Sequence, residues 1–110
     1  MTLISDDMVQ KAFDWLNENS NMAAGAKADR IRAEYGVKKA KAKVFLASAG
    51  TVAERESEAI CSDEFSNAVE KEAEAVADDE FYRDNRSKCI AIIDAWRTEQ
   101  SNLRGMSRVG

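Results

Sequence analysis

Residues that could carry out chemistry are scarce in this 110-residue sequence. There is no histidine, which removes the most common general base and the most common metal ligand. Cys61 and Cys89 lack metal or redox spacing, and no phosphate-cradling glycine loop or nucleophile elbow occurs. Acidic pairs at helical spacing, such as Glu70 with Glu74, arise by chance among twenty acidic residues. The sequence therefore predicts a protein that is not an enzyme and has no metal, cofactor or small-molecule substrate.

Clustered cations give the sharpest candidate for a binding site. Residues 27–43 hold seven basic residues against two acidic ones. Such a cluster on one side of a helix suits contact with a phosphate backbone, although only Tyr35 and Phe45 lie nearby for base stacking. The alternative is pairing with an acidic stretch of the same chain, and we favour it because the charge blocks coincide. The candidate contacts for nucleic acid or a partner protein are Arg30, Arg32, Lys38, Lys39, Lys41 and Lys43.

A second candidate is a protein interface in the C-terminal half, formed by Phe81, Ile92, Trp96 and Arg97. Trp and Arg are the residues most enriched at binding hot spots, whereas Phe81 and Ile92 point away from the main apolar stripe of their predicted helix. A tryptophan on an apolar stripe is more often a core residue. Trp15 could pack against Trp96, and both would then be structural.

Composition sets the class of protein. A net charge of −4 and a pI near 4.9 argue against a protein that coats nucleic acid with its whole surface. The N-terminus lacks the pattern of a secretory signal, and no apolar run approaches the roughly 18 to 20 residues that span a bilayer. Two cysteines without a pairing pattern suit a reducing compartment. The expected location is the cytoplasm, without membrane association.

Turn-forming residues are rare, since there is no proline and only five glycines, so long helices are expected. Ser5 and Ser62, each followed by two acids, and Thr51, three residues before a glutamate, are helix-start signals. Gly50 suits the end of a preceding helix. The predicted helices span 6–18, 22–48, 52–60 and 63–104, with a disordered tail at 105–110, in a single domain of residues 1–110.

The two long helices carry apolar residues at the coiled-coil interval of three and four. In the first, the predicted seam is Ala24, Ala28, Ile31, Tyr35, Lys38, Ala42, Phe45 and Ala49. In the second it is Phe65, Val69, Val76, Tyr82, Cys89, Ile90, Ile93, Trp96 and Leu103. The fold class is therefore all-α: a long antiparallel, coiled-coil-like helical hairpin, with a short N-terminal helix and a short helix at the turn.

Charge blocks favour the antiparallel direction. Residues 54–84 hold twelve acids against three bases. Folding the chain back near residue 56 places the basic 27–43 stretch beside the acidic 69–85 stretch, and places the acidic first helix near Arg97 and Arg104. Exposed ion pairs contribute only about 0.2 to 1 kcal/mol each, so they fix register more than they add stability. Cys61 and Cys89 would lie too far apart for a disulfide.

The sequence also resembles a family of small helical proteins encoded by tailed phages and prophages. The resemblance covers nearly the whole chain and rests on residues 7–16, the basic helix, residues 45–48, the Gly-Thr-Val-Ala-Glu-Arg-Glu segment at 50–56, Trp96-Arg97 and the closing residues 102–104. It implies an accessory role in phage recombination or replication, in the host bacterial cytoplasm, through single-stranded DNA or a recombination protein. The alternative is a protein-only adaptor or inhibitor that meets a host factor through the acidic face around Glu70–Asp84.

Self-association is the first testable expectation. A two-helix hairpin buries only one seam, and Phe81 and Ile92 lie off that seam, so we expect a homo-oligomer. Light scattering at micromolar concentration should give a mass above that of one chain, and a single monomeric species would contradict the expectation.

Overall fold

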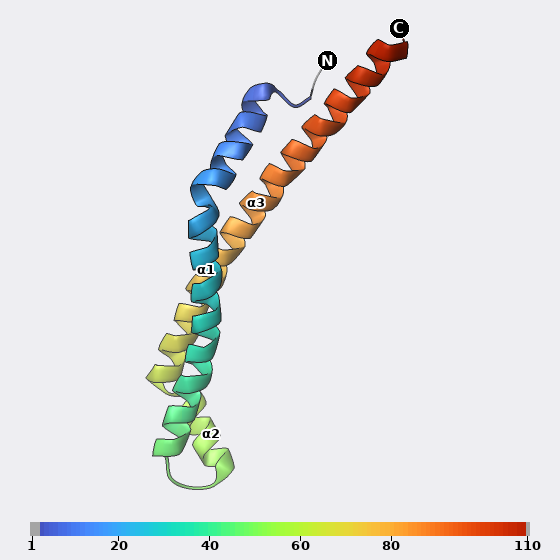
Figure 1. Ribbon diagram of the computed structural model, residues 1–110. Helices are drawn as coiled ribbons and strands as arrows, with labels where there is room; N and C mark the ends of the chain where they lie inside the picture. Colours follow the sequence, from blue (N-terminus) through green and yellow to red (C-terminus); the bar gives the residue numbers. More distant parts are fainter. Residues whose placement is uncertain (1–2, 110) are drawn as a thin grey trace. The chain divides into compact units, whose positions relative to one another are not determined.

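The computed structural model describes residues 3–109, with side chains to Ser107, and that part of the chain is all-helical. Two long helices, α1 (Asp6–Ala47) and α3 (Asp63–Val109), are joined through the short helix α2 (Val52–Ile60) (Figure 1). No strand occurs in the described range. None of these helices combines the length and apolar character needed to cross a bilayer.

The three predicted helix starts are confirmed, because each capping side chain accepts a backbone hydrogen bond. The Met8 N–H donates to Ser5 Oγ over 3.1 Å. The Glu54 N–H donates to Thr51 Oγ1, and the Phe65 N–H to Ser62 Oγ, each over 3.2 Å. Each cap satisfies one of the backbone donors that a helix N-terminus leaves unpaired.

The structure differs from the prediction at two helix boundaries. The polar residues 17–21 do not end the first helix, and α1 runs unbroken through them. Asn19 instead donates its side-chain N–H to the Trp15 carbonyl over 2.9 Å inside the helix. At the other end α3 continues to Val109, so residues 105–109 are helical rather than disordered, while residue 110 lies outside the described range. Gly105 does not take the positive φ with which glycine often ends a helix.

The chain divides into two compact units. Unit 1 combines α1 up to Ala23 with α3 from Phe81 onward, and unit 2 consists of residues 24–80. Each unit therefore pairs part of α1 with part of α3.

Unit 1 is held by a small apolar core between its two helical segments. Ala12, Cys89 and Ile93 are buried, and Trp15, Leu16 and Ile92 pack against them. The rings of Trp15 and Tyr82 lie 6.3 Å apart. Nearer the chain ends, Trp96 Nε1 donates to Asp6 Oδ1 over 3.2 Å, and the Leu3 N–H donates to Glu99 Oε1 over 2.8 Å. In these contacts, residues nearer the N-terminus of α1 contact residues nearer the C-terminus of α3, so the two segments are antiparallel.

In unit 2 the inward side of α1 is not the predicted one. The predicted Ala28 and Phe45 are half-buried, but the continuous row of buried and half-buried positions is Ala26, Arg30, Ala33, Val37, Ala40 and Val44, which we call the inner seam. They follow the expected steps of three and four, two residues out of phase with the prediction, so the predicted Ile31 and Tyr35 are 48% and 62% exposed. The inner seam is built mainly from small residues, which allow helices to approach closely. The prediction placed the larger apolar residues inward, and these lie on the side of α1 opposite to the inner seam.

The predicted seam of α3 is also partly wrong, because it too was chosen by the size of apolar side chains. Phe65, Val76, Tyr82, Cys89, Ile93 and Trp96 are buried or half-buried as predicted. Val69, Ile90 and Leu103 are more than 40% exposed. Asp79 instead occupies a seam position and is only 4% exposed. A charged residue at such a position was not predicted.

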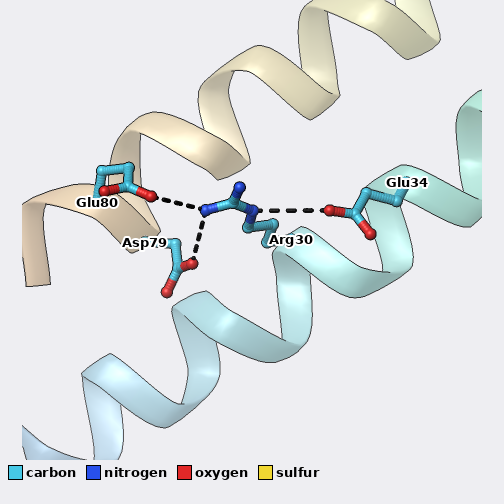
Figure 2. A network of polar contacts seen from close by, with 4 residues as sticks. All are labelled: Arg30, Glu34, Asp79 and Glu80. Atoms are coloured by element: carbon cyan, nitrogen blue, oxygen red, sulfur yellow. Dashed lines mark hydrogen bonds and ion pairs between the residues drawn. The ribbon is translucent and has the colours of Figure 1, made fainter. Parts of the chain in front are cut away.

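Arg30 explains how that carboxylate is accommodated. Its Nη1 lies 3.1 Å from Asp79 Oδ2 and 2.9 Å from Glu80 Oε1, both on α3. Its Nε lies 3.6 Å from Glu34 Oε1 on α1 (Figure 2). Hydrogen bonds to Glu80 and Asp79 raise the pKa of Arg30 above its usual value. The stabilisation would be lost only above that raised pKa, so the arginine keeps its charge throughout the ordinary pH range.

The turn region is fixed by contacts between α1 and α2. The Arg55 guanidinium lies 4.5 Å from the Phe45 ring centroid, and Arg55 Nε donates to the Phe45 carbonyl over 3.1 Å. Ala59 on α2 is completely buried. Gly50, between the helices, has a φ of 110°, a conformation that side chains with a Cβ rarely adopt. Arg55 thus satisfies a carbonyl at the end of α1, as helix ends require.

Removing one side of the Arg30 network should destabilise the protein more than removing the other. Arg30→Ala leaves Asp79 buried without its cation, whereas Asp79→Ala leaves Arg30 with Glu80 and Glu34. We expect Asp79→Ala to cost about 1 to 3 kcal/mol and Arg30→Ala to cost more, measured by urea denaturation followed by circular dichroism.

The matched control is Arg32→Ala, because Arg32 pairs over 3.1 Å with Asp29 at the helix surface, where ion pairs contribute little. The double variant Arg30→Met with Asp79→Leu should equal the parent or exceed it, as apolar replacements of buried pairs often do. Equal stability of Arg30→Ala and Arg32→Ala would contradict a structural role for the network.

Two glycines should respond to alanine in opposite directions. At Gly50 a Cβ would meet the Glu54 side chain and the φ is positive, so Gly50→Ala should destabilise by about 1 kcal/mol or more. At Gly36 a Cβ would meet nothing within 4 Å inside α1, so Gly36→Ala should stabilise by about 0.5 to 1 kcal/mol. Thermal unfolding of the two variants tests this, and a shift in the same direction for both would refute it.

Candidate functional site

Cysteines and acidic residues are the possible metal ligands among the described residues. No group of three or more His, Cys, Asp or Glu side chains in that range could hold a metal ion. Cys61 is exposed in unit 2, and Cys89 is buried in the core of unit 1, both as free thiols.

The basic stretch of α1 separates into arginines that are engaged and lysines that are not. Arg30 points into the contact with α3, where Asp79 and Glu80 hold it (Figure 2). Arg32 is bound to Asp29 one turn away on its own helix. Pairing within the chain thus accounts for both arginines among the six predicted contacts, and Arg30 is a structural residue rather than a surface contact.

The four remaining candidates, Lys38, Lys39, Lys41 and Lys43, are all exposed, and we call them the lysine face. The inner-seam residues Val37, Ala40 and Val44 alternate with them along the helix, so that Lys38 and Lys41 flank the seam on one side and Lys39 and Lys43 flank it on the other. Among the side chains described, no carboxylate lies within ion-pair distance of these lysines. Asp29 and Glu34, the two acids of the basic stretch, are bound to Arg32 and Arg30. The favoured pairing of the basic stretch with the acidic one therefore holds for Arg30 and does not extend to the lysines.

The two aromatic residues near the lysine face have different surroundings. Phe45 is half-buried beneath the Arg55 guanidinium. Tyr35 is 62% exposed, and the Lys38 ammonium nitrogen lies 5.7 Å from its ring centroid. Tyr35 is therefore the aromatic residue that is open to a ligand on this side of α1.

Apolar residues that the site prediction left out share the exposed side of α1 with the lysines. Ile31 is 48% exposed and Leu46 is 75% exposed. Together with Tyr35 and Ala42 they follow helical spacing, which puts them on one side of the helix. The sequence prediction assigned Ile31, Tyr35 and Ala42 to the seam and did not include Leu46.

The predicted interface residues of α3 also divide. Phe81 is 57% exposed and contacts Tyr82 edge to face, with the ring centroids 5.3 Å apart. Ile92 packs against the buried cluster of Ala12, Cys89 and Ile93, so it belongs to the core of unit 1 and not to an outer surface.

Trp96 and Arg97 lie side by side at the surface of unit 1. Trp96 is half-buried and bonds to Asp6, while Trp15 contacts Tyr82, so the expected pairing of the two tryptophans is replaced by these contacts. Arg97 is exposed and lies 3.9 Å from Asp94 on its own helix. The acidic first turn of α1 thus meets Trp96 rather than Arg97. Trp96 and Arg97 line a shallow hollow together with Gln100 and Arg104.

An acidic row lies on the exposed side of α3 in unit 2. Glu70, Glu74 and Asp78 are exposed and stand one helical turn apart. Asp79 and Glu80 differ from them, because both are engaged by Arg30.

Comparison with known proteins gives no further assignment: no protein-family model, curated protein or solved structure matches this chain.

Proposed function

We propose that this chain is a non-enzymatic accessory protein that binds nucleic acid, single-stranded DNA in particular, through the lysine face of α1. One observation carries the proposal: four lysines within six residues are exposed while both acids of the same stretch are bound to arginines. Exposed cations clustered within two turns of a helix give a surface at which a phosphate backbone can bind.

The negative net charge does not conflict with this proposal. Charges are screened over about 8 to 10 Å at ordinary ionic strength, so a phosphate beside α1 responds mainly to nearby lysines. The acids elsewhere confine binding to this one face and make it weak at high salt. Binding is therefore expected to be local and strongly dependent on ionic strength.

The biological setting follows from the sequence resemblance to small helical proteins of tailed phages and prophages. Recombination and replication of phage DNA expose single strands in the bacterial cytoplasm, and an accessory protein would act on them directly or beside a recombination protein. The paucity of catalytic groups suits a protein that binds and presents its partner rather than changing it.

A second candidate is a protein-only adaptor or inhibitor of a host factor. The exposed acidic row of Glu70, Glu74 and Asp78 favours it, since regularly spaced carboxylates can meet a basic partner surface. Reversal of these three charges would then abolish capture of the partner and leave oligonucleotide binding unchanged.

Charge reversal on the lysine face should abolish DNA binding. In fluorescence anisotropy with a labelled single-stranded oligonucleotide at low salt, the variant Lys39→Glu, Lys41→Glu, Lys43→Glu should lose at least tenfold in affinity. For four phosphate contacts, the logarithm of the binding constant should fall with the logarithm of salt concentration with a slope of about −3, and losing three contacts should reduce the slope by about 2.

The matched control reverses three lysines elsewhere, Lys11→Glu, Lys71→Glu and Lys88→Glu, which changes the net charge equally. It should keep most of the binding and the salt dependence. Circular dichroism checks that both variants remain helical. If the control loses as much affinity as the lysine-face variant, net charge rather than a site governs binding and the proposal fails.

A further inference from the structure

We propose that Tyr35 is a stacking platform for an unpaired base, which makes the lysine face selective for single strands over duplex. This inference rests on the proposed function and names the form of nucleic acid that the site takes. It also assigns a binding role to a residue that the charge pattern alone does not select.

Exposure distinguishes Tyr35 from the other aromatic residues of unit 2. Tyr35 is 62% exposed as a residue, whereas Phe45 and Phe65 are half-buried and Phe45 lies against Arg55. Tyr35 is the one exposed aromatic residue within residues 24–80, and around the helix it lies between Lys38 and Lys39. An exposed ring at the centre of a cationic surface is the combination that proteins use to hold single strands.

The spacing of Tyr35 and its neighbours matches the layout of a nucleotide. Lys38 and Lys39 follow Tyr35 by three and four residues, so both side chains lie one turn from the ring on the helix surface. The Lys38 ammonium nitrogen already lies 5.7 Å from the ring centroid. A base stacked on the ring would therefore have its phosphate beside an ammonium group. Ile31, 48% exposed and one turn before Tyr35, extends the apolar surface for a neighbouring base.

Duplex DNA cannot use this ring. Its bases are stacked on one another, and their flat faces become accessible only after unpairing, which costs free energy. The lysines can contact the phosphates of single-stranded and duplex DNA alike. The tyrosine ring can stack only on an unpaired base, so it strengthens the binding of single strands alone. Selectivity should therefore depend on Tyr35, and general affinity on the lysines.

A second copy of the chain is a weaker candidate for this surface. Two identical lysine faces brought together would oppose like charges, because the acids of the same stretch are already bound to arginines. A polyanion neutralises the lysines as it covers the apolar residues between them. The charge of the surface thus selects nucleic acid over self-contact.

The test compares Tyr35→Leu with Tyr35→Phe in the full chain. A labelled oligothymidine and a mixed-sequence duplex of equal length are the two ligands, titrated by anisotropy at low salt. Leucine keeps the apolar bulk and removes the aromatic ring, whereas phenylalanine keeps the ring. We expect Tyr35→Leu to lose about tenfold in affinity for the single strand and less than twofold for the duplex, and Tyr35→Phe to retain the parent affinity for both.

Equal losses on both ligands, or no loss on the single strand, would overturn the role of Tyr35. If single-strand binding depends on Lys39, Lys41 and Lys43 but not on Tyr35, this inference fails and the proposed function stands. If the parent chain binds neither ligand, the proposed function fails. Light scattering of Tyr35→Leu tests whether the surface around Tyr35 serves self-association. A change of mass without a change in DNA affinity would assign the surface to self-association and overturn the inference.

Discussion

The Arg30–Asp79 contact is the constraint on which the arrangement of unit 2 depends. Asp79 is almost fully buried at a seam position of α3, and Arg30 is the cation that compensates it. A buried carboxylate without its cation is strongly unfavourable, so any sliding or rotation of α1 that separates the two residues is penalised. Alanine-rich seams fix register poorly because every alanine resembles the next. In unit 2 a polar pair supplies the specificity that apolar packing lacks, as single polar residues do in coiled coils.

The rotation of α1 that this pair sets also determines what the protein presents outward. With Arg30 turned toward α3, the small residues of the inner seam face inward, and Ile31, Tyr35 and the lysine face are turned outward. Glu34 and Asp29, which would otherwise neutralise nearby lysines, are drawn to arginines on the same helix. The rotation of α1 about its axis therefore sets both the packing of the inner seam and the charge that unit 2 exposes on α1. The candidate binding surface is a consequence of how the two helices pack.

The sequence predicted the helical class, the three helix starts and the buried cysteine, because capping residues, missing prolines and heptad spacing are local signals. It did not predict which side of α1 turns inward. Ile31 and Tyr35 are larger and more apolar than Ala33 and Ala40, and so were predicted to face inward. The inward side instead carries the half-buried Arg30, which bonds to the buried Asp79 49 residues further along the chain. For the same reason the sequence did not separate Arg30, for which the favoured pairing with the acidic stretch holds, from the lysines, for which it does not, and it assigned Ile92 to an interface although Ile92 joins a core formed by α1 and α3. Exposure of the lysines and of Tyr35 could be inferred only after the inward side was known.

The sequence separation of the contacts has a consequence for how the molecule forms and opens. Unit 2 contains its own turn, and its contacts begin with Arg55 and Phe45, only 10 residues apart. Unit 1 joins residues up to 96 positions apart, as Leu3 and Glu99 are. Closing a short loop costs less conformational entropy than closing a long one, so the turn region is the natural nucleus and the chain ends should associate last. In the native state the chain ends should open first and the turn region last. Amides near the termini should therefore exchange hydrogen faster than amides beside α2.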